Sequence, residues 1–95
     1  MSLVTTKGML LTAREGNYAV GAFNANNLEM AKGIIEAAEE ENAPVIVQIS
    51  QGGAEHAGIE EITAVVKVLA RRAEVPVAIH LDHGLTYAWN IKALR

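Results

Sequence analysis

The sequence predicts an α/β domain in which parallel strands alternate with helices along the chain. Two apolar runs rich in valine and isoleucine begin at a proline, Pro44 or Pro76, and a helical apolar stripe separates them. Shifting the chain by 32 positions lays one run on the other, so one strand–helix unit is repeated. Strands that are joined through a helix run parallel, and this alternation therefore indicates a parallel sheet with right-handed crossovers.

A helix, a strand and a second helix are expected in the first part of the chain. Residues 6–15 carry apolar side chains at helical spacing, and residues 18–23 form a strand that ends at Asn24. Asn26, with Glu29 three residues later, predicts a capping box at the start of the next helix. The apolar stripe of that helix consists of Leu28, Ala31, Ile34, Ile35 and Ala38.

The second part of the chain continues the same alternation. Pro44 precedes a strand over residues 45–50, where proline costs no ladder hydrogen bond, and residues 51–58 form the loop that leaves it. The next helical stripe consists of Ile59, Ile62, Val65, Val66, Leu69 and Ala70. Residues 77–82 form the third strand, and after Gly84 a further helical stripe begins.

Two architectures fit this order of elements: the first three units of a (β/α)8 barrel, or a small doubly wound sheet. The barrel is favoured because all three strands end in polar residues, which a barrel brings together in one ring around a site. These residues are Asn24, Ser50 and the pair Asp82–His83. A barrel takes about 250 residues. We therefore expect residues 1–95 to be the N-terminal part of a single barrel domain that is incomplete in this chain.

The composition argues against several classes of partner. The 95 residues carry a formal net charge of −3 with Lys and Arg scattered, so no basic surface for nucleic acid is predicted. No apolar run reaches the roughly 18 residues of a membrane span, and residues 1–11 lack a secretory signal, so we expect a cytoplasmic protein without membrane contact. The chain has no cysteine, so any metal ion must be bound by His and carboxylate side chains.

The residues best suited to chemistry end the third predicted strand. The segment His80-Leu81-Asp82-His83-Gly84 ends an apolar run with three ionisable side chains, and Asp82 is the only aspartate in the chain. Unpaired charge is costly to bury, so this cluster indicates a polar site just outside the sheet. His80 shares a strand face with Asp82, and we expect it to pack or to support the site rather than to bind a metal ion. Strand-end polar residues also serve as caps and turn residues, which is the other interpretation of Asn24 and Ser50.

Three segments resemble class II, zinc-dependent fructose-bisphosphate aldolases and the related tagatose-bisphosphate enzymes. They are residues 18–24 (YAVGAFN), residues 43–50 (APVIVQIS) with Gly52-Gly53, and residues 80–84 (HLDHG). The similarity covers the chain from about residue 3 onward. It implies that Asp82 is the catalytic acid/base and that His83 is a zinc ligand. It also implies that Asn24 and Ser50 help to hold the distal phosphate of the substrate.

The resemblance further implies a lyase of carbohydrate metabolism that acts in glycolysis. Such an enzyme uses Zn²⁺ or another divalent cation to cleave a ketose 1,6-bisphosphate reversibly into glycerone phosphate and glyceraldehyde 3-phosphate. Fructose 1,6-bisphosphate is the expected substrate, and tagatose 1,6-bisphosphate is the alternative. A cation suits this reaction because a Lewis acid stabilises the negative charge that aldol cleavage leaves. A carboxylate such as Asp82 can transfer the proton of the C4 hydroxyl.

By this resemblance, His83 would be one of the three protein ligands that a catalytic zinc site keeps, and in the family the others lie further along the chain. We therefore expect the 95-residue chain alone to lack a complete active site. A Schiff-base mechanism is disfavoured because all four lysines fall in or beside predicted helices. Open strand edges and exposed apolar stripes favour self-association, so we expect a homo-oligomer. The alternative function is a truncated, non-catalytic α/β module that binds a phosphorylated ligand or a partner.

Overall fold

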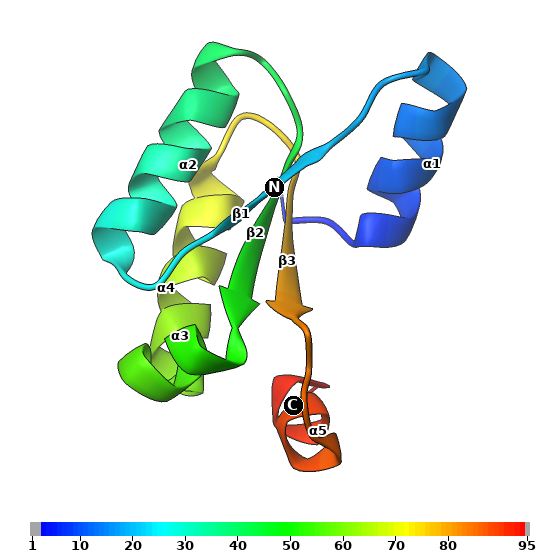
Figure 1. The fold of residues 1–95 in the computed structure, drawn as a ribbon. Coiled ribbons are helices and arrows are strands. Elements are labelled where there is room, and N and C mark those ends of the chain that lie inside the picture. Colours follow the sequence, from blue (N-terminus) through cyan, green and yellow to red (C-terminus); the bar gives the residue numbers. More distant parts are fainter. Residues whose placement is uncertain (1–2, 95) are drawn as a thin grey trace.

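The computed structural model describes residues 3–94, which form a three-stranded parallel sheet flanked by helices (Figure 1). The elements are α1 Thr6–Gly16, β1 Gly21–Asn24, α2 Leu28–Glu40, β2 Val45–Ser50, α3 Gln51–Ala57, α4 Ile59–Arg72, β3 Val77–Asp82 and α5 Tyr87–Leu94. In this part of the chain, no helix has the length and apolar character needed to cross a membrane. The predicted α/β class with parallel strands is confirmed.

The order of the strands in the sheet separates the two architectures that fit the sequence. β1 pairs with β2, and β2 pairs with β3, so the sheet follows the order of the chain. A doubly wound sheet contains a point where the strand order reverses, and helices cover both of its faces. Between residues 3 and 94 the order does not reverse, and α2 and α4 lie on the same side of the sheet (Figure 1). This is the arrangement of successive units in a (β/α)8 barrel.

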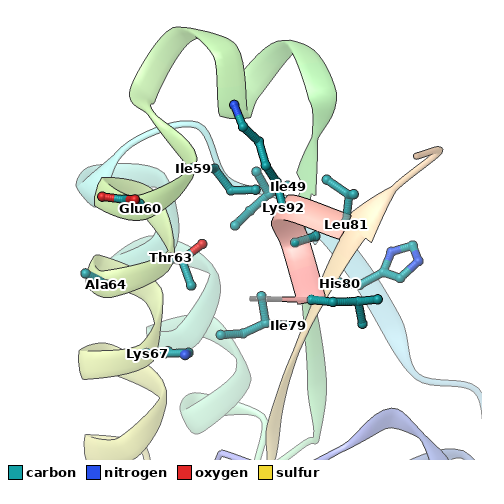
Figure 2. A pocket seen from close by; sticks show the side chains of 12 residues that line it. Ile49, Ile59, Glu60, Thr63, Ala64, Lys67, Ile79, His80, Leu81 and Lys92 are labelled. Carbon is teal, nitrogen blue, oxygen red and sulfur yellow. The ribbon is translucent and has the colours of Figure 1, made fainter. Parts of the chain in front are cut away.

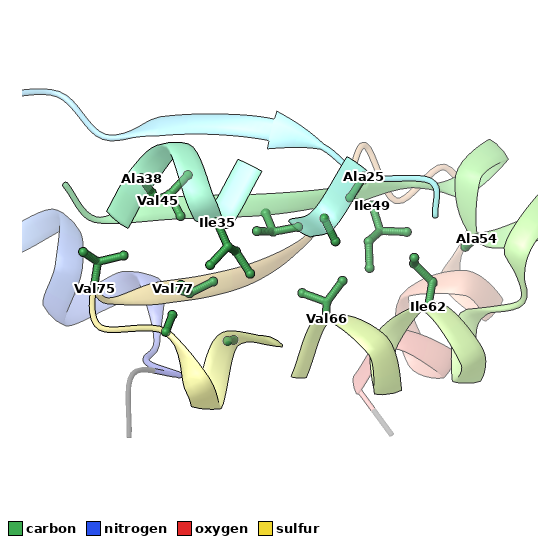
Figure 3. Packing of buried hydrophobic residues seen from close by; sticks show 14 residues of the cluster. Ala25, Ile35, Ala38, Val45, Ile49, Ala54, Ile62, Val66, Val75 and Val77 are labelled. Atoms are coloured by element: carbon green, nitrogen blue, oxygen red, sulfur yellow. The ribbon is translucent and has the colours of Figure 1, made fainter. Parts of the chain in front are cut away.

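One face of the sheet packs on α2 and α4 and forms the hydrophobic core (Figure 3). In β2, Val45, Val47 and Ile49 are buried, whereas the residues between them are partly exposed, because side chains alternate between the two faces of a strand. Val66 of α4 and Val77 of β3 are fully buried with Val47. The buried residues of α2 are Ala31, Ile35 and Ala38. The alternation leaves the polar residues of the strands on the face that α2 and α4 do not cover.

Helix α1 lies outside this two-layer core, on the side of the sheet away from α2 and α4 (Figure 1). The segment before it is attached to the beginning of β3, where the Val4 N–H donates to the Val77 carbonyl at 2.9 Å. Asn17 ends the helix in the left-handed conformation, with φ of 57°, which asparagine adopts readily. Met9 and Ala13 are the buried residues of α1.

The first strand and the cap of the helix after it differ from the prediction. β1 begins at Gly21, later than predicted, because its partner strand β2 begins only at Val45. The N-cap of α2 is Asn27 rather than Asn26. The side chain of Asn27 accepts a hydrogen bond from the Met30 N–H at 2.8 Å. The capping box is therefore replaced by a single side-chain cap one residue later.

Two further elements also differ from the prediction. Residues 51–58, expected as a loop, contain the helix α3, which forms because the Ser50 side chain caps it and Ala54 packs in the core. The helix expected after Gly84 is present as α5, but two residues of its apolar stripe are exposed. Tyr87 is 80% exposed and Leu94 is 82% exposed, because residues 3–94 contain no fourth strand for α5 to cover.

Replacing Asn27 with alanine should lower the free energy of unfolding by about 0.5–2 kcal/mol, because the acceptor for the Met30 N–H is lost. Chemical denaturation followed by circular dichroism measures this difference. Asn27→Asp is the matched control, since aspartate caps a helix about as well as asparagine. Equal losses of stability in the two variants would contradict the role of the cap.

Candidate active site at the strand ends

Polar side chains from all three strands lie on the face of the sheet that α2 and α4 leave uncovered. Residues paired in register share a face, and the register pairs Asn24 with Gln48 and Gln48 with His80. Two residues further along, it pairs Ser50 with Asp82. Figure 2 shows the ring of His80 pointing away from α4. Three of the four predicted site residues, Asn24, Ser50 and Asp82, therefore share one face.

The fourth predicted residue, His83, follows β3 in a left-handed turn. The φ angle is 68° at His83 and 60° at Gly84, and the Gly84 N–H donates to the Asp82 carbonyl at 2.9 Å. Histidine adopts this conformation more readily than most residues. Asn90 of α5 supports the turn, because its Nδ2 donates to the Gly84 carbonyl at 3.3 Å. The turn interrupts the alternation of the strand and brings His83 Nε2 to 3.4 Å from Asp82 Oδ2.

The Asp82–His83 pair offers the donor types of a metal site. The Asp82 side chain is 24% exposed, and the His83 side chain is 69% exposed, so the imidazole is open to groups from outside. Imidazole and carboxylate are ligands that Zn²⁺ takes, and a catalytic zinc site keeps three protein ligands. Among the described residues, no three His, Asp or Glu side chains gather into a group that could hold a metal ion. His83 therefore fits one ligand position of a metal site, with the Asp82 carboxylate beside it.

Ser50 lies at the end of β2 and also begins α3. Its Oγ accepts the Gly53 N–H at 3.0 Å and so caps the helix. A hydroxyl group both accepts and donates, so the hydroxyl hydrogen is left to donate to a ligand. The interpretations of Ser50 as a cap and as a binding residue are therefore compatible.

Sequence reasoning misses one residue of this face, Gln48. Its Nε2 donates to Asn24 Oδ1 at 3.3 Å, and its Oε1 lies 3.2 Å from His80 Nδ1. The internal repeat carries the signal that could have found it. The shift of 32 positions that aligns the two proline-led strands also lays Gln48 on His80.

A hollow of about 480 Å³ lies between α4, β3 and α5 (Figure 2). Apolar side chains such as Ile49, Ile59 and Ile79 line much of it, and neither Asp82 nor His83 does. Of the polar residues that the strands carry on the opposite face, only His80 lines it. The hollow is therefore a gap in the helix layer at the open edge of the sheet rather than the candidate active site.

Comparisons with known proteins identify the family. Residues 4–95 match the family described as fructose-bisphosphate aldolase class-II. The fructose-bisphosphate aldolase of Thermus caldophilus is 50% identical over 93 residues, which cover 98% of this chain and 30% of that protein. The probable fructose-bisphosphate aldolase of Bacillus subtilis (strain 168) is 47% identical over 97 residues, which cover 99% of this chain and 34% of that protein. The chain belongs to the class II fructose-bisphosphate aldolase family.

A solved structure has the same arrangement of elements. The YdjI aldolase from Escherichia coli K12 matches with a TM-score of 0.90 and 33% identity, over 97% of this chain and 36% of that chain. The three parallel strand–helix units therefore have the architecture of one part of a known aldolase. The chain spans about one third of the length of the relatives that it matches.

Two neighbouring glycines of α3 should respond differently to alanine. A Cβ at Gly53 would collide with Asn26 Oδ1, an atom that is buried without a hydrogen-bond partner in the described part of the chain. A Cβ at Gly52 would meet Ser50 Oγ at an ordinary contact distance of 3.9 Å.

We expect Gly53→Ala to lower the free energy of unfolding by about 1–3 kcal/mol, as overpacking does. Its control, Gly52→Ala, should leave the stability unchanged or raise it by about 0.5–1 kcal/mol, because alanine favours a helix more than glycine does. Urea denaturation of the two variants measures the difference. Equal changes in the free energy of unfolding would show that the contact with Asn26 does not restrict the side chain at position 53 of α3.

Proposed function

We propose that this chain, as a member of the class II fructose-bisphosphate aldolase family, forms part of an enzyme that cleaves a ketose 1,6-bisphosphate reversibly into glycerone phosphate and glyceraldehyde 3-phosphate. Fructose 1,6-bisphosphate is the proposed substrate, because the relatives from Thermus and Bacillus are named for it. Tagatose 1,6-bisphosphate is the alternative substrate. The observation that carries the proposal is the Asp82–His83 pair at the end of β3 in a chain of this family.

We further propose that residues 1–95 are the N-terminal part of a single (β/α)8 domain. Among residues 3–94, β1 and β3 are the edge strands of the sheet, with only the bridge from Leu3 on the first residue of β3, and an apolar hollow lies beside each of them. The volumes are about 770 Å³ along β1 and α2 and about 480 Å³ beside β3. Phe23, which is 54% exposed, lines the larger hollow. Further strand–helix units would pair with the edges and fill both hollows. The homo-oligomer and the cytoplasmic location stay predictions.

The proposed roles follow from the place of each side chain. The Asp82 carboxylate, partly buried beside His83, acts as the acid/base that takes and returns the proton of the C4 hydroxyl. His83 holds Zn²⁺ or another divalent cation together with ligands from outside the described residues. When bound, the cation stabilises developing negative charge as a Lewis acid. Asn24 and Ser50 donate N–H and O–H groups to the distal phosphate.

Two alternatives have less support. A Schiff-base aldolase needs a lysine at its site, and the four lysines of this chain lie on α1, α2, α4 and α5. A non-catalytic module that binds a phosphorylated ligand would use Asn24 and Ser50 but would leave the Asp82–His83 pair without a role. Turnover of a sugar bisphosphate, rather than its binding alone, therefore separates the enzyme from the module.

In the aldolase that contains this segment, Asp82→Ala should lower kcat by about 10²–10⁴, the usual contribution of acid/base catalysis, and should leave the zinc content nearly unchanged. His83→Gly should lose zinc and, as a consequence, activity. Glycine is the suitable replacement because it adopts the left-handed conformation of His83 without strain. Elemental analysis and steady-state kinetics measure both effects. Unchanged turnover in Asp82→Ala, or equal zinc in the two variants, would refute the corresponding role.

Asn24→Ala and Ser50→Ala should chiefly raise KM for fructose 1,6-bisphosphate, because they remove contacts to a group remote from the reaction. Neither should change KM for fructose 1-phosphate, which lacks the distal phosphate. Since Ser50 also caps α3, thermal melting must first show that its variant is folded at the assay temperature. A similar rise in KM for both substrates would contradict the contact with the distal phosphate.

A further inference from the structure

A row of three hydrogen-bonded side chains crosses the sheet on the face that carries the candidate site. Asn24, Gln48 and His80 occupy the same position in the register of β1, β2 and β3. Gln48 Nε2 donates to Asn24 Oδ1 at 3.3 Å, and Gln48 Oε1 lies 3.2 Å from His80 Nδ1. Gln48 is therefore held at both ends of its amide group, by side chains from the strands on either side.

The row has a single direction of donation. Gln48 presents its amine to Asn24, so its carbonyl oxygen faces His80. A carbonyl oxygen only accepts hydrogen bonds, so the His80 ring must carry a proton on Nδ1. Donation therefore runs from His80 through Gln48 to Asn24. The reversed row would place the proton of the neutral ring on Nε2 and would turn both amides over.

We propose that Gln48 and His80 are positioning residues that set the orientation of the Asn24 amide for the substrate. Because Gln48 engages Oδ1, Asn24 presents its Nδ2 group, which is a donor, to a ligand. Phosphate oxygens accept hydrogen bonds, and an amide oxygen would repel them, so only the observed direction suits an anion. The inference rests on the proposed function, in which Asn24 holds the distal phosphate.

Preorganisation is the reason that this orientation matters. The terminal torsion of an asparagine is broad, so an unsupported amide can turn either its oxygen or its NH₂ group toward a ligand. Holding the amide in one orientation before the substrate arrives removes the ordering cost from binding. The effect of the row should therefore appear in the affinity for the phosphate end of the substrate and not in the chemical step.

Gln48→Glu is the most informative variant because it is nearly isosteric. It keeps an oxygen toward His80 but removes the amine that holds Asn24 Oδ1. We expect KM for fructose 1,6-bisphosphate to rise about 10- to 100-fold, the effect of losing a hydrogen bond to a charged group. The kcat should stay within about twofold, and KM for fructose 1-phosphate should not change.

Variants of His80 test the row without adding a negative charge. His80→Leu removes the donor to Gln48 and should raise KM for the bisphosphate in the same way. His80→Asn keeps an N–H group near the position of Nδ1 and should stay close to the wild type. Equal KM values in these two variants would contradict the positioning role.

The direction of the row can also be measured without the reaction. In ¹⁵N–¹H correlation spectra recorded on the neutral ring, the proton of His80 should be found on Nδ1. A proton on Nε2 would overturn the inference, because the Asn24 amide would then present its oxygen to the ligand.

Asn24→Ala separates failure of this inference from failure of the proposed function. If Asn24→Ala raises KM for the bisphosphate alone and Gln48→Glu does not, the phosphate contact stands and the positioning row is overturned. If Asn24→Ala changes KM equally for both substrates, the phosphate contact is wrong and both proposals fall.

Discussion

The parallel pairing of three strands in one register determines which side chains of this chain can meet. With Gly21 opposite Val45 and Val45 opposite Val77, alternation commits every second residue to the core under α2 and α4. A slip of one residue would turn the polar residues into that core and the buried valines outward. Val47 is fully buried. Its burial therefore determines the position of the candidate site as well as that of the core.

Much of this fold could be predicted because its central strands are strongly apolar. β2 and β3 lie at the predicted residues, since each is an apolar run led by a proline. The start of β1 and the helix α3, which were wrongly predicted, depend in part on contacts with residues distant in the chain. Two of the seven residues of α3 are glycines, which disfavour a helix. The helix nevertheless forms, because Ser50 caps it and Ala54 packs into a core that the local sequence does not display.

The residues of the candidate site also differ in how well the sequence predicts them. Asp82 and His83 stand out in the sequence because ionisable residues rarely end an apolar run, and their proximity needs only the left-handed turn at His83 and Gly84. Gln48 does not stand out, since one glutamine in a strand is typical of an exposed face. Its contacts lie 24 residues before it and 32 residues after it. Only the register of the sheet brings these side chains together.

The order of the strands also has a consequence for how the chain folds. Between residues 3 and 94, β2 pairs with β1 and β3 pairs with β2, so neither β2 nor β3 must wait for a strand from further along the chain in order to join the sheet. Domains are synthesised from the N-terminus, at a rate that leaves time for local assembly. β2 can therefore dock on β1 once α2 has emerged from the ribosome, and β3 can follow after α4. The sheet grows by one unit at a time, and the newest strand is the template for the next.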